Sequence, residues 1–308
     1  IRLFDIDRMM KLLNDVQPSI VVSTLPSAAA AMSFLKVHGL TQVPTITVIT
    51  DHSYHSYWLH PETDLYLVGS DRVRQALEQY SIPAHQIRVT GIPVRESFTR
   101  QYDRLALRHK HGLDPSLPVV TVMGGGYGLI GKELLGLLMG QALDRPMQFV
   151  IVCGHNEKLK AQLETEWAES REFRDPSHRI LVKGYVDYIH ELMALSDLLV
   201  TKPGGITTAE ALAQELPMLL YKPLPGQEQD NAAFLTDLGV AEQADSERDL
   251  AEKLIRLFQN SSRMATMKEN ARRHQTKTAA VTAVHEIMNT MREPATKTAM
   301  AHAMYAEA

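Results

Sequence analysis

The sequence alternates short apolar runs with longer segments in which apolar residues recur every three or four positions. The runs are rich in Val, Ile and Leu, as expected for strands that are buried on both faces of a sheet. In the first third of the chain they lie at 19–24, 44–50, 65–68 and 87–90. Helical periodicity precedes or separates them at 3–16, 27–38 and 70–80, and Ser70 is placed to cap the last of these helices. This alternation predicts a parallel α/β domain.

A second series of the same kind follows a charged stretch at 93–118. Its apolar runs lie at 119–123, 149–153, 180–183, 198–201 and 218–221, and a helix-like stretch follows each run. We therefore predict an α/β fold with two Rossmann-like, doubly wound domains. The predicted boundaries are 1–98 for the first domain, 99–117 for the passage between domains, 118–290 for the second domain and 291–308 for a C-terminal tail.

The composition is that of an ordinary folded protein. Of the 308 residues, 44% are hydrophobic and 22% are charged, which argues against disorder. A formal net charge of −4 gives no reason to expect a nucleic-acid partner. Basic residues are nevertheless concentrated between Arg72 and His111. They could form a surface for anionic lipid headgroups, or they could be a solvated helix face followed by a linker.

Cys153 is the only cysteine, so an intrachain disulfide is excluded and a reducing compartment is expected. Because it follows an apolar run, we predict a buried, inert thiol rather than a nucleophile. No apolar run approaches about 18 residues, so any membrane contact should be peripheral. We expect a cytoplasmic protein on the inner face of the cell membrane. The opening residues resemble an amphipathic helix rather than a signal peptide, and the natural start is expected upstream of Ile1.

Glycines follow two strands of the predicted second domain. Parallel sheets bind ligands beyond the carboxyl ends of their strands. Gly124–Gly128 lies between a strand and a helix, where backbone N–H groups can approach a phosphate, although such turns are often only tight turns. Gly204 and Gly205 open a similar turn after the strand at 198–201.

Polar residues accompany these glycines. Glu210 lies about one helical turn after Thr207 and Thr208, where its carboxylate can accept both hydroxyls of a ribose. The alternative is that Thr207 caps the helix and Glu210 completes a capping box. A third loop at 223–231 presents an amide and a carboxylate suited to the hydroxyls of a sugar, although polar loops of this composition are common.

Several segments together resemble bacterial processive diacylglycerol glucosyltransferases and their relatives, the plant monogalactosyldiacylglycerol synthases, of glycosyltransferase family 28. The resemblance is carried by 182–186, by 201–205 with Glu210, by 221–228 with Asn231, and upstream by 48–52, 58–60 and 90–94. It extends over roughly 12–285. It implies the GT-B fold, in which two Rossmann-like domains face a cleft, with the UDP-sugar on the C-terminal domain and the lipid acceptor on the N-terminal one.

The resemblance also implies roles for individual residues. Glu210 would hold the uridine ribose, Gly125 and Gly126 would face the diphosphate, and Gln227 with Glu228 would contact the donor hexose. The full set of expected donor-site residues is Gly125, Gly126, Gly204, Gly205, Thr207, Glu210, Gln227, Glu228 and Asn231. No metal and no cofactor are expected, since a helix dipole and backbone donors can offset the charge of the leaving group.

The sequence departs from the family pattern at its start. Members of the family begin with a strand and a glycine-rich loop that contains a histidine, and both would precede the equivalent of Ile1. The loop helps to form the cleft and is itself a candidate base. We therefore expect the N-terminal domain to be incomplete and the chain as given to be inactive.

The implied reaction transfers a hexose, expected to be glucose, from a UDP-sugar to 1,2-diacylglycerol with inversion. Inversion by direct displacement needs a base near the acceptor hydroxyl. Asp51 is the candidate because it ends a strand of the acceptor domain, although Asp is also common as a cap at such positions. His52, Trp58 and His60 are assigned to contact with the acceptor and the membrane. Their spacing fits no standard zinc site.

Three other functions compete with this one. A UDP-N-acetylglucosamine 2-epimerase would share the fold, and a non-catalytic UDP-sugar sensor would share the donor site. A nicotinamide-dependent dehydrogenase is disfavoured, because Gly124–Gly128 lacks the required glycine spacing and no acid follows the next strand. The pattern does not choose between UDP-glucose and UDP-galactose.

Overall fold

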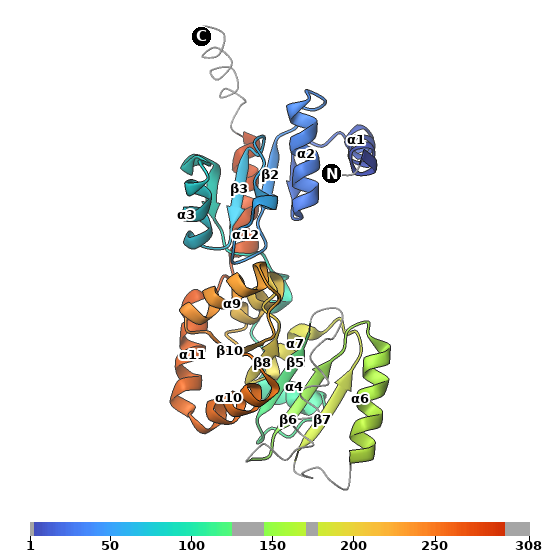
Figure 1. Ribbon diagram of the computed structural model, residues 1–308, viewed down its shortest axis with the longest axis vertical. Helices are drawn as coiled ribbons and strands as arrows, with labels where there is room; N and C mark the ends of the chain where they lie inside the picture. The colour runs from blue at the N-terminus through green and yellow to red at the C-terminus, as the bar shows by residue number, and fades with distance from the viewer. Residues whose placement is uncertain (1–2, 125–144, 171–177, 293–308) are drawn as a thin grey trace. The chain divides into compact units, whose positions relative to one another are not determined.

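The computed structural model describes residues 3–124, 145–170 and 178–292 (Figure 1). Both of its sheets are parallel, one with four strands and one with six. This confirms the predicted α/β fold with two Rossmann-like domains. No helix within the described ranges combines the length and the apolarity needed to cross a bilayer.

The chain divides into two compact units, each with its own sheet. Unit 1 comprises Ile1–Thr50, Tyr54–Pro93 and Thr278–Ala308, and unit 2 comprises Asp51–Ser53 and Val94–Lys277. The short segment that follows the second strand of unit 1 is therefore grouped with unit 2. The last helix of the chain is grouped with unit 1.

Unit 1 has a four-stranded sheet whose strands are neighbours in chain order. The strands are β1 (Val21–Ser23), β2 (Thr45–Val48), β3 (Leu65–Val68) and β4 (Ile87–Val89), and the helices are α1 (Leu3–Val16), α2 (Pro26–Val37), α3 (Asp71–Gln79) and α12 (Ala279–Arg292). Ser70 caps α3 as predicted, because its side chain accepts a hydrogen bond from the backbone N–H of Val73.

Both faces of this sheet are covered. Leu65 and Leu67 pack with Ala283 of α12, whereas Tyr66 packs on the other face with Leu77 of α3. Since successive residues of a strand point to opposite faces, every residue of β3 must be apolar. This explains why the strand reads as a continuous apolar run.

Helix α12 belongs to a different unit from the one predicted from the sequence. The predicted second domain extends to residue 290, but Ala283 and Ile287 pack on the sheet of unit 1. Arg88, which lies in β4, also pairs with Glu286 at 3.3 Å. Helical periodicity shows which face of a helix is apolar, but it does not show which sheet that face covers.

Unit 2 has a six-stranded sheet in the order β10-β9-β8-β5-β6-β7. The strands are β5 (Val119–Met123), β6 (Gln148–Val152), β7 (Arg179–Lys183), β8 (Leu198–Thr201), β9 (Met218–Tyr221) and β10 (Ala241–Ala244). Strands β6 and β7 lie on one side of β5. Strands β8, β9 and β10 follow later in the chain and lie on the other side of β5. The strand order therefore reverses between β5 and β8.

Helices cover both faces of this second sheet. They are α4 (Arg104–Lys110), α6 (Glu157–Glu169), α7 (Ile189–Leu195), α8 (Gly205–Ala213), α9 (Gln227–Asp237), α10 (Glu247–Gln259) and α11 (Ser261–His274). Helices α6 and α10 pack on one face, and α4, α7, α8 and α9 pack on the other. Cys153 lies in the first of these cores, fully buried, and burial raises the pKa of its thiol to about 11. The prediction that this thiol is buried is confirmed, and its inertness stays a prediction.

Candidate functional site

The candidate site lies where the strand order of the second sheet reverses. The carboxyl ends of β5 and β8 lead into Gly124 and into the segment 202–205. In open α/β sheets, diverging connections at such a point leave a crevice that binds ligands. Gly125 and Gly126, predicted to face a diphosphate, lie outside the described residues.

Helix α8 starts at this point, directly after β8. Gly204 is its N-cap and Gly205 its first residue, so no side chain caps the helix. A Cβ built on Gly204 would meet no atom of the described residues within 4 Å, so the space beside the turn is open as far as these residues define it. The uncapped backbone N–H groups and the positive end of the helix dipole are therefore available to an anion.

Glu210 lies farther along the same helix with only 9% of its surface exposed. Burial raises the pKa of its carboxyl group to about 7, and the positive charge of Arg95 opposes that shift. The capping-box alternative is wrong, because α8 begins at Gly205 and Thr207 already lies inside its first turn. The carboxylate of Glu210 therefore has no capping role to explain its position. A ligand that donates hydrogen bonds to it would stabilise its charged form.

His52 takes part in a buried network in unit 2. Its backbone N–H donates to Oδ1 of Asn231 at 3.0 Å, and Nδ2 of Asn231 donates to the carbonyl of Pro203 at 3.0 Å. Its ring Nε2 lies 2.9 Å from Oγ1 of Thr208. The side chain is 4% exposed, and burial lowers the pKa of the ring to about 4. The ring of His52 is buried among α8 and α9, and its contact with the acceptor or the membrane stays a prediction.

Asn231 also differs from the expectation. It is predicted to line the donor site, but it is fully buried and its amide oxygen and nitrogen both have protein partners. In the structure it connects the segment 51–53 to the turn before α8. Its contact with a donor sugar stays a prediction.

Gln227 and Glu228 lie at the start of α9, beyond the end of β9. The preceding Gly226 has a φ of 90°, a conformation that favours glycine and turns the chain sharply into the helix. Oε2 of Glu228 accepts a hydrogen bond from the backbone N–H of Leu224 at 2.7 Å, which folds the loop back onto the helix. Both residues follow β9, the strand that neighbours β8 and therefore the glycine turn beyond it.

Asp51 belongs to unit 2, whereas Trp58 and His60 belong to unit 1. Asp51 is 6% exposed and precedes His52 in the buried network. Trp58 is also buried, and the hydroxyl of Tyr66 bonds both to the backbone N–H and to the carbonyl of His60. Within the described part of the chain, Nε1 of Trp58 and Nε2 of His60 are buried without a hydrogen-bond partner. Burial lowers the pKa of His60.

An aromatic pair on the same edge of the second sheet was not predicted from the sequence. His155 follows β6 and Tyr185 follows β7, and their exposed rings stack with centroids 4.4 Å apart and planes inclined by 13°. The signal was present in the sequence, since each residue follows a glycine at the end of a strand. The pair offers a flat surface on the edge of the second sheet where its strand order reverses.

The basic stretch is largely neutralised within the fold. Its ion pairs are Arg74–Asp71, Arg88–Glu286, Arg100–Glu96, Arg104–Asp197, Arg108–Asp197 and Lys110–Glu191. Several of these paired side chains are nevertheless exposed, and a role of the stretch as a surface for anionic lipid headgroups stays a prediction. A search of the described ranges finds no group of three His, Cys, Asp or Glu side chains placed to hold a metal ion. That the protein uses no metal stays a prediction.

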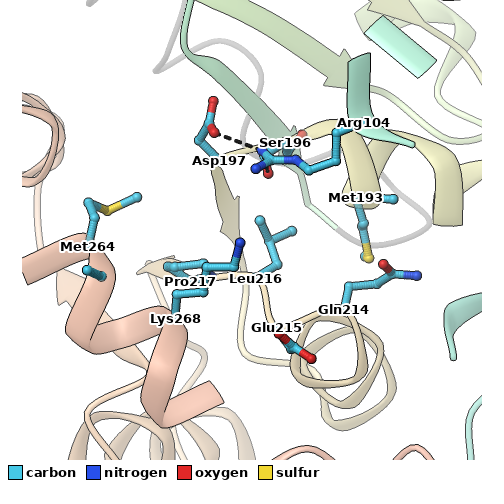
Figure 2. Close-up of a pocket in the computed structure, with 12 residues that line it drawn as sticks. Arg104, Met193, Ser196, Asp197, Gln214, Glu215, Leu216, Pro217, Met264 and Lys268 are labelled. Atoms are coloured by element: carbon cyan, nitrogen blue, oxygen red, sulfur yellow. Dashed lines mark hydrogen bonds and ion pairs between the residues drawn. The ribbon is translucent and has the colours of Figure 1, made fainter. Parts of the chain in front are cut away.

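A pocket of about 180 Å³ lies at the opposite edge of the same sheet (Figure 2). Asp197 and Pro217, which precede β8 and β9, line it together with Arg104 and Lys268. Figure 2 shows the bond from Arg104 to Asp197, which measures 2.8 Å. Because the pocket faces the amino ends of the strands, it is separate from the crevice at their carboxyl ends.

Comparison with known proteins agrees with this architecture. The model of the monogalactosyldiacylglycerol (MGDG) synthase family matches residues 1–94, and the model of the glycosyltransferase family 28 C-terminal domain matches residues 119–284. A curated relative, the processive diacylglycerol beta-glucosyltransferase of Bacillus pumilus (strain SAFR-032), is 33% identical over 283 residues. The match covers 92% of this chain and 71% of the relative.

Solved structures share the fold at low sequence identity. MurG of Acinetobacter baumannii gives a TM-score of 0.65 at 15% identity, covering 91% of this chain and 76% of MurG. The UDP-GlcNAc 2-epimerase of Neisseria meningitidis gives 0.69 at 17% identity, covering 92% and 80%. These likenesses concern the fold alone. The two family models and the curated relative go further: this chain belongs to the family of monogalactosyldiacylglycerol synthases and processive diacylglycerol glucosyltransferases, within glycosyltransferase family 28.

Proposed function

We propose that this protein is a hexosyltransferase that passes a hexose from a UDP-sugar to 1,2-diacylglycerol with inversion, making a glycolipid. The observation that carries the proposal is the uncapped start of α8 beside the buried Glu210, at the switch point of the second sheet. A site of this kind combines donors for a diphosphate with an acceptor for sugar hydroxyls. The name of the Bacillus pumilus relative supports diacylglycerol as the acceptor and glucose as the sugar.

The order of the strands supports one orientation of the UDP-sugar along the carboxyl edge of the second sheet. From β9 to β7, the carboxyl edge presents Gln227, then the turn at Gly204 with Glu210 on the following helix, and finally the stacked rings of His155 and Tyr185. A UDP-sugar contains the same kinds of group in the same order: hexose, diphosphate, ribose and base. We propose that these groups bind at those positions, with the base against the aromatic pair.

The proposed chemistry is a single displacement. The acceptor hydroxyl forms a bond to the anomeric carbon as the bond from that carbon to the phosphate oxygen breaks, and UDP leaves with both electrons. Asp51 is proposed to take the proton of the hydroxyl. Backbone N–H groups at the start of α8 stabilise the charge that develops on the leaving phosphate, and we expect no metal or cofactor in this step.

Acceptor recognition is proposed to involve the loop that contains Trp58 and His60. Within the described residues, Nε1 of Trp58 is buried without a hydrogen-bond partner, and a buried polar group of this kind is costly unless a hydrogen bond satisfies it. A glycerol hydroxyl can supply that bond. Tyr57, in the same loop, is 76% exposed, and aromatic rings of this kind are favoured at a headgroup layer.

We further propose that the protein is cytoplasmic and binds peripherally to the inner face of the cell membrane, with anionic lipid as a partner. Sedimentation with vesicles tests this. We expect more protein to pellet with vesicles of phosphatidylcholine and phosphatidylglycerol than with phosphatidylcholine alone, and we expect salt to weaken the difference. Equal pelleting with both compositions would remove anionic lipid from the proposal, and no pelleting with either would remove the membrane.

The decisive experiment measures transfer of radiolabelled sugar from UDP-glucose and UDP-galactose into diacylglycerol in mixed micelles. It uses this chain and, in parallel, the same chain extended at its N-terminus with the corresponding segment of the Bacillus pumilus relative. Transfer by either protein supports the proposal and names the sugar. Binding of UDP without transfer by either would favour a sensor, and lipid-independent turnover of UDP-N-acetylglucosamine would favour an epimerase.

A further inference from the structure

The imidazole of His52 packs against the first turn of α8. Its Nε2 lies 2.9 Å from Oγ1 of Thr208, and its ring stacks on Phe234 with centroids 5.1 Å apart and planes inclined by 17°. Oγ1 of Thr208 in turn lies 2.9 Å from the carbonyl of Gly204 and 3.1 Å from that of Gly205. The histidine is therefore connected through one hydroxyl to both glycines of the turn.

The hydroxyl of Thr208 lies between the ring of His52 and the carbonyls of the turn, and its single proton limits which groups can donate. A threonine hydroxyl has one proton to donate, and the carbonyls of Gly204 and Gly205 can only accept it. When the hydroxyl donates its proton to one of these carbonyls, it accepts from the ring of His52, and Nε2 is then the atom that carries the ring proton. Burial lowers the pKa of the ring, which keeps it neutral with that single proton.

A second connection reaches the same turn through the backbone of His52. Its N–H donates to Oδ1 of Asn231, whose Nδ2 donates to the carbonyl of Pro203. Asn231 is fully buried, so both bonds are shielded from water. Ring and backbone of His52 therefore hold the turn from two sides.

We propose that His52 is a positioning residue that holds the turn at 203–205 and the first turn of α8 in the conformation that binds phosphate. The proposal rests on the proposed function for the identity of the ligand. Backbone donors help an anion most when they are fixed before it binds. Because Asp51 is the neighbouring residue, the same network also fixes the backbone of the proposed base.

The test is calorimetric titration of UDP into the wild-type chain and four variants. His52→Leu and Thr208→Val each remove the ring hydrogen bond, and we expect each to weaken UDP binding about five- to tenfold, the scale of one hydrogen bond. His52→Gln retains an N–H donor and should recover most of the affinity. Since both changes break the same bond, the double variant His52→Leu/Thr208→Val should bind no more weakly than the weaker single variant.

His109→Leu is the matched control, since His109 is exposed on α4 and should leave UDP affinity unchanged. Circular dichroism establishes that each variant is folded, and Thr208→Val still reports on the bond if His52→Leu does not fold. If the wild type binds UDP and Thr208→Val or His52→Leu binds it equally well, the positioning role is overturned while the proposed function stands. If the wild type itself does not bind UDP, the proposed donor site and this inference fall together.

Discussion

The two sheets of the molecule differ in the order of their strands. In unit 1 the strands β1 to β4 are neighbours in chain order, whereas in unit 2 the chain returns from β7 to place β8 beside β5. Only the second arrangement, among the strands that the structure describes, has connections that diverge from neighbouring strands. A ligand crevice at the carboxyl edge is a consequence of that divergence. The glycine turn that we propose binds phosphate is therefore found in unit 2 for a topological reason.

The same difference appears in how the polar residues beyond the strands are used. Beyond β8, the glycine turn is open and Glu210 is held in a buried position on α8. Beyond β2, the segment 51–53 is grouped with unit 2, where Asn231 and Thr208 bind His52. Unit 2 thus provides the crevice and also fixes the segment that carries the proposed base.

The largest effect is expected from Asp51→Asn, which tests whether that segment takes part in the chemistry. Loss of a general base lowers turnover by about 100- to 10,000-fold. UDP affinity should stay the same, because the backbone bond from His52 to Asn231 does not involve the carboxylate. Transfer assays and UDP titrations on the N-terminally extended protein measure the two quantities. Asp71→Asn, at an exposed position on α3, is the control, and full turnover in Asp51→Asn would eliminate Asp51 as the base.

The next largest effect concerns the stability of unit 2. Arg108 is 7% exposed, and it pairs with Asp197 at 2.7 Å and donates to the carbonyl of Leu195 at 3.0 Å. Arg108→Met would remove a buried charged hydrogen bond to Asp197, which keeps its pair with Arg104, and should cost about 2–3 kcal/mol in the free energy of unfolding. The exposed pair of Arg100 with Glu96 gives the control Arg100→Met, which should have a much smaller effect on stability. Urea unfolding measures the change in the free energy of unfolding for both variants. Similar losses would show that burial of the Arg108–Asp197 pair does not increase its contribution to stability.

Local sequence pattern is sufficient to predict much of this architecture. The strands β1 to β9, the glycine turn before α8 and the position of Glu210 all follow from short apolar runs and from the residues directly after them. Each of these features depends on neighbours in the chain. For that reason the pattern alone predicts a candidate donor site at the edge of a parallel sheet.

The features that the sequence could not provide depend on contacts between distant segments. His52 is grouped with Trp58 and His60 by its position in the sequence, yet its partners lie at 208 and 231. Strand β10 reads Ala-Glu-Gln-Ala and has no apolar run, so only its pairing with β9 defines it. Likewise, the unit to which α12 belongs depends on the sheet against which its apolar face packs.

A smaller effect is expected from the protonation of Glu210. Its pKa of about 7 means that the carboxyl group is increasingly protonated below neutral pH and charged above it. Because only the charged form accepts hydrogen bonds from both ribose hydroxyls, UDP affinity should fall up to tenfold for each pH unit below 7 and level off above it. Titrations of UDP between about pH 5.5 and 8.5 measure this, because that range brackets the raised pKa of Glu210. Glu210→Gln should bind UDP more weakly by about 1–3 kcal/mol and show no such dependence. An unchanged affinity in Glu210→Gln would remove Glu210 from the donor site.

The smallest effect tests which unit α12 stabilises. Ile287 packs with Ala283 against the sheet of unit 1, whereas Val284, on the same helix, is 54% exposed. Ile287→Ala should therefore cost about 1–2 kcal/mol, and Val284→Ala less than about 0.5 kcal/mol. Hydrogen exchange locates the loss, because opening of one unit exposes the amides of its own strands. We expect faster exchange in β2 and β3 and no change in β8 and β9. Faster exchange in β8 and β9 instead would mean that α12 stabilises unit 2, as its position in the sequence indicates.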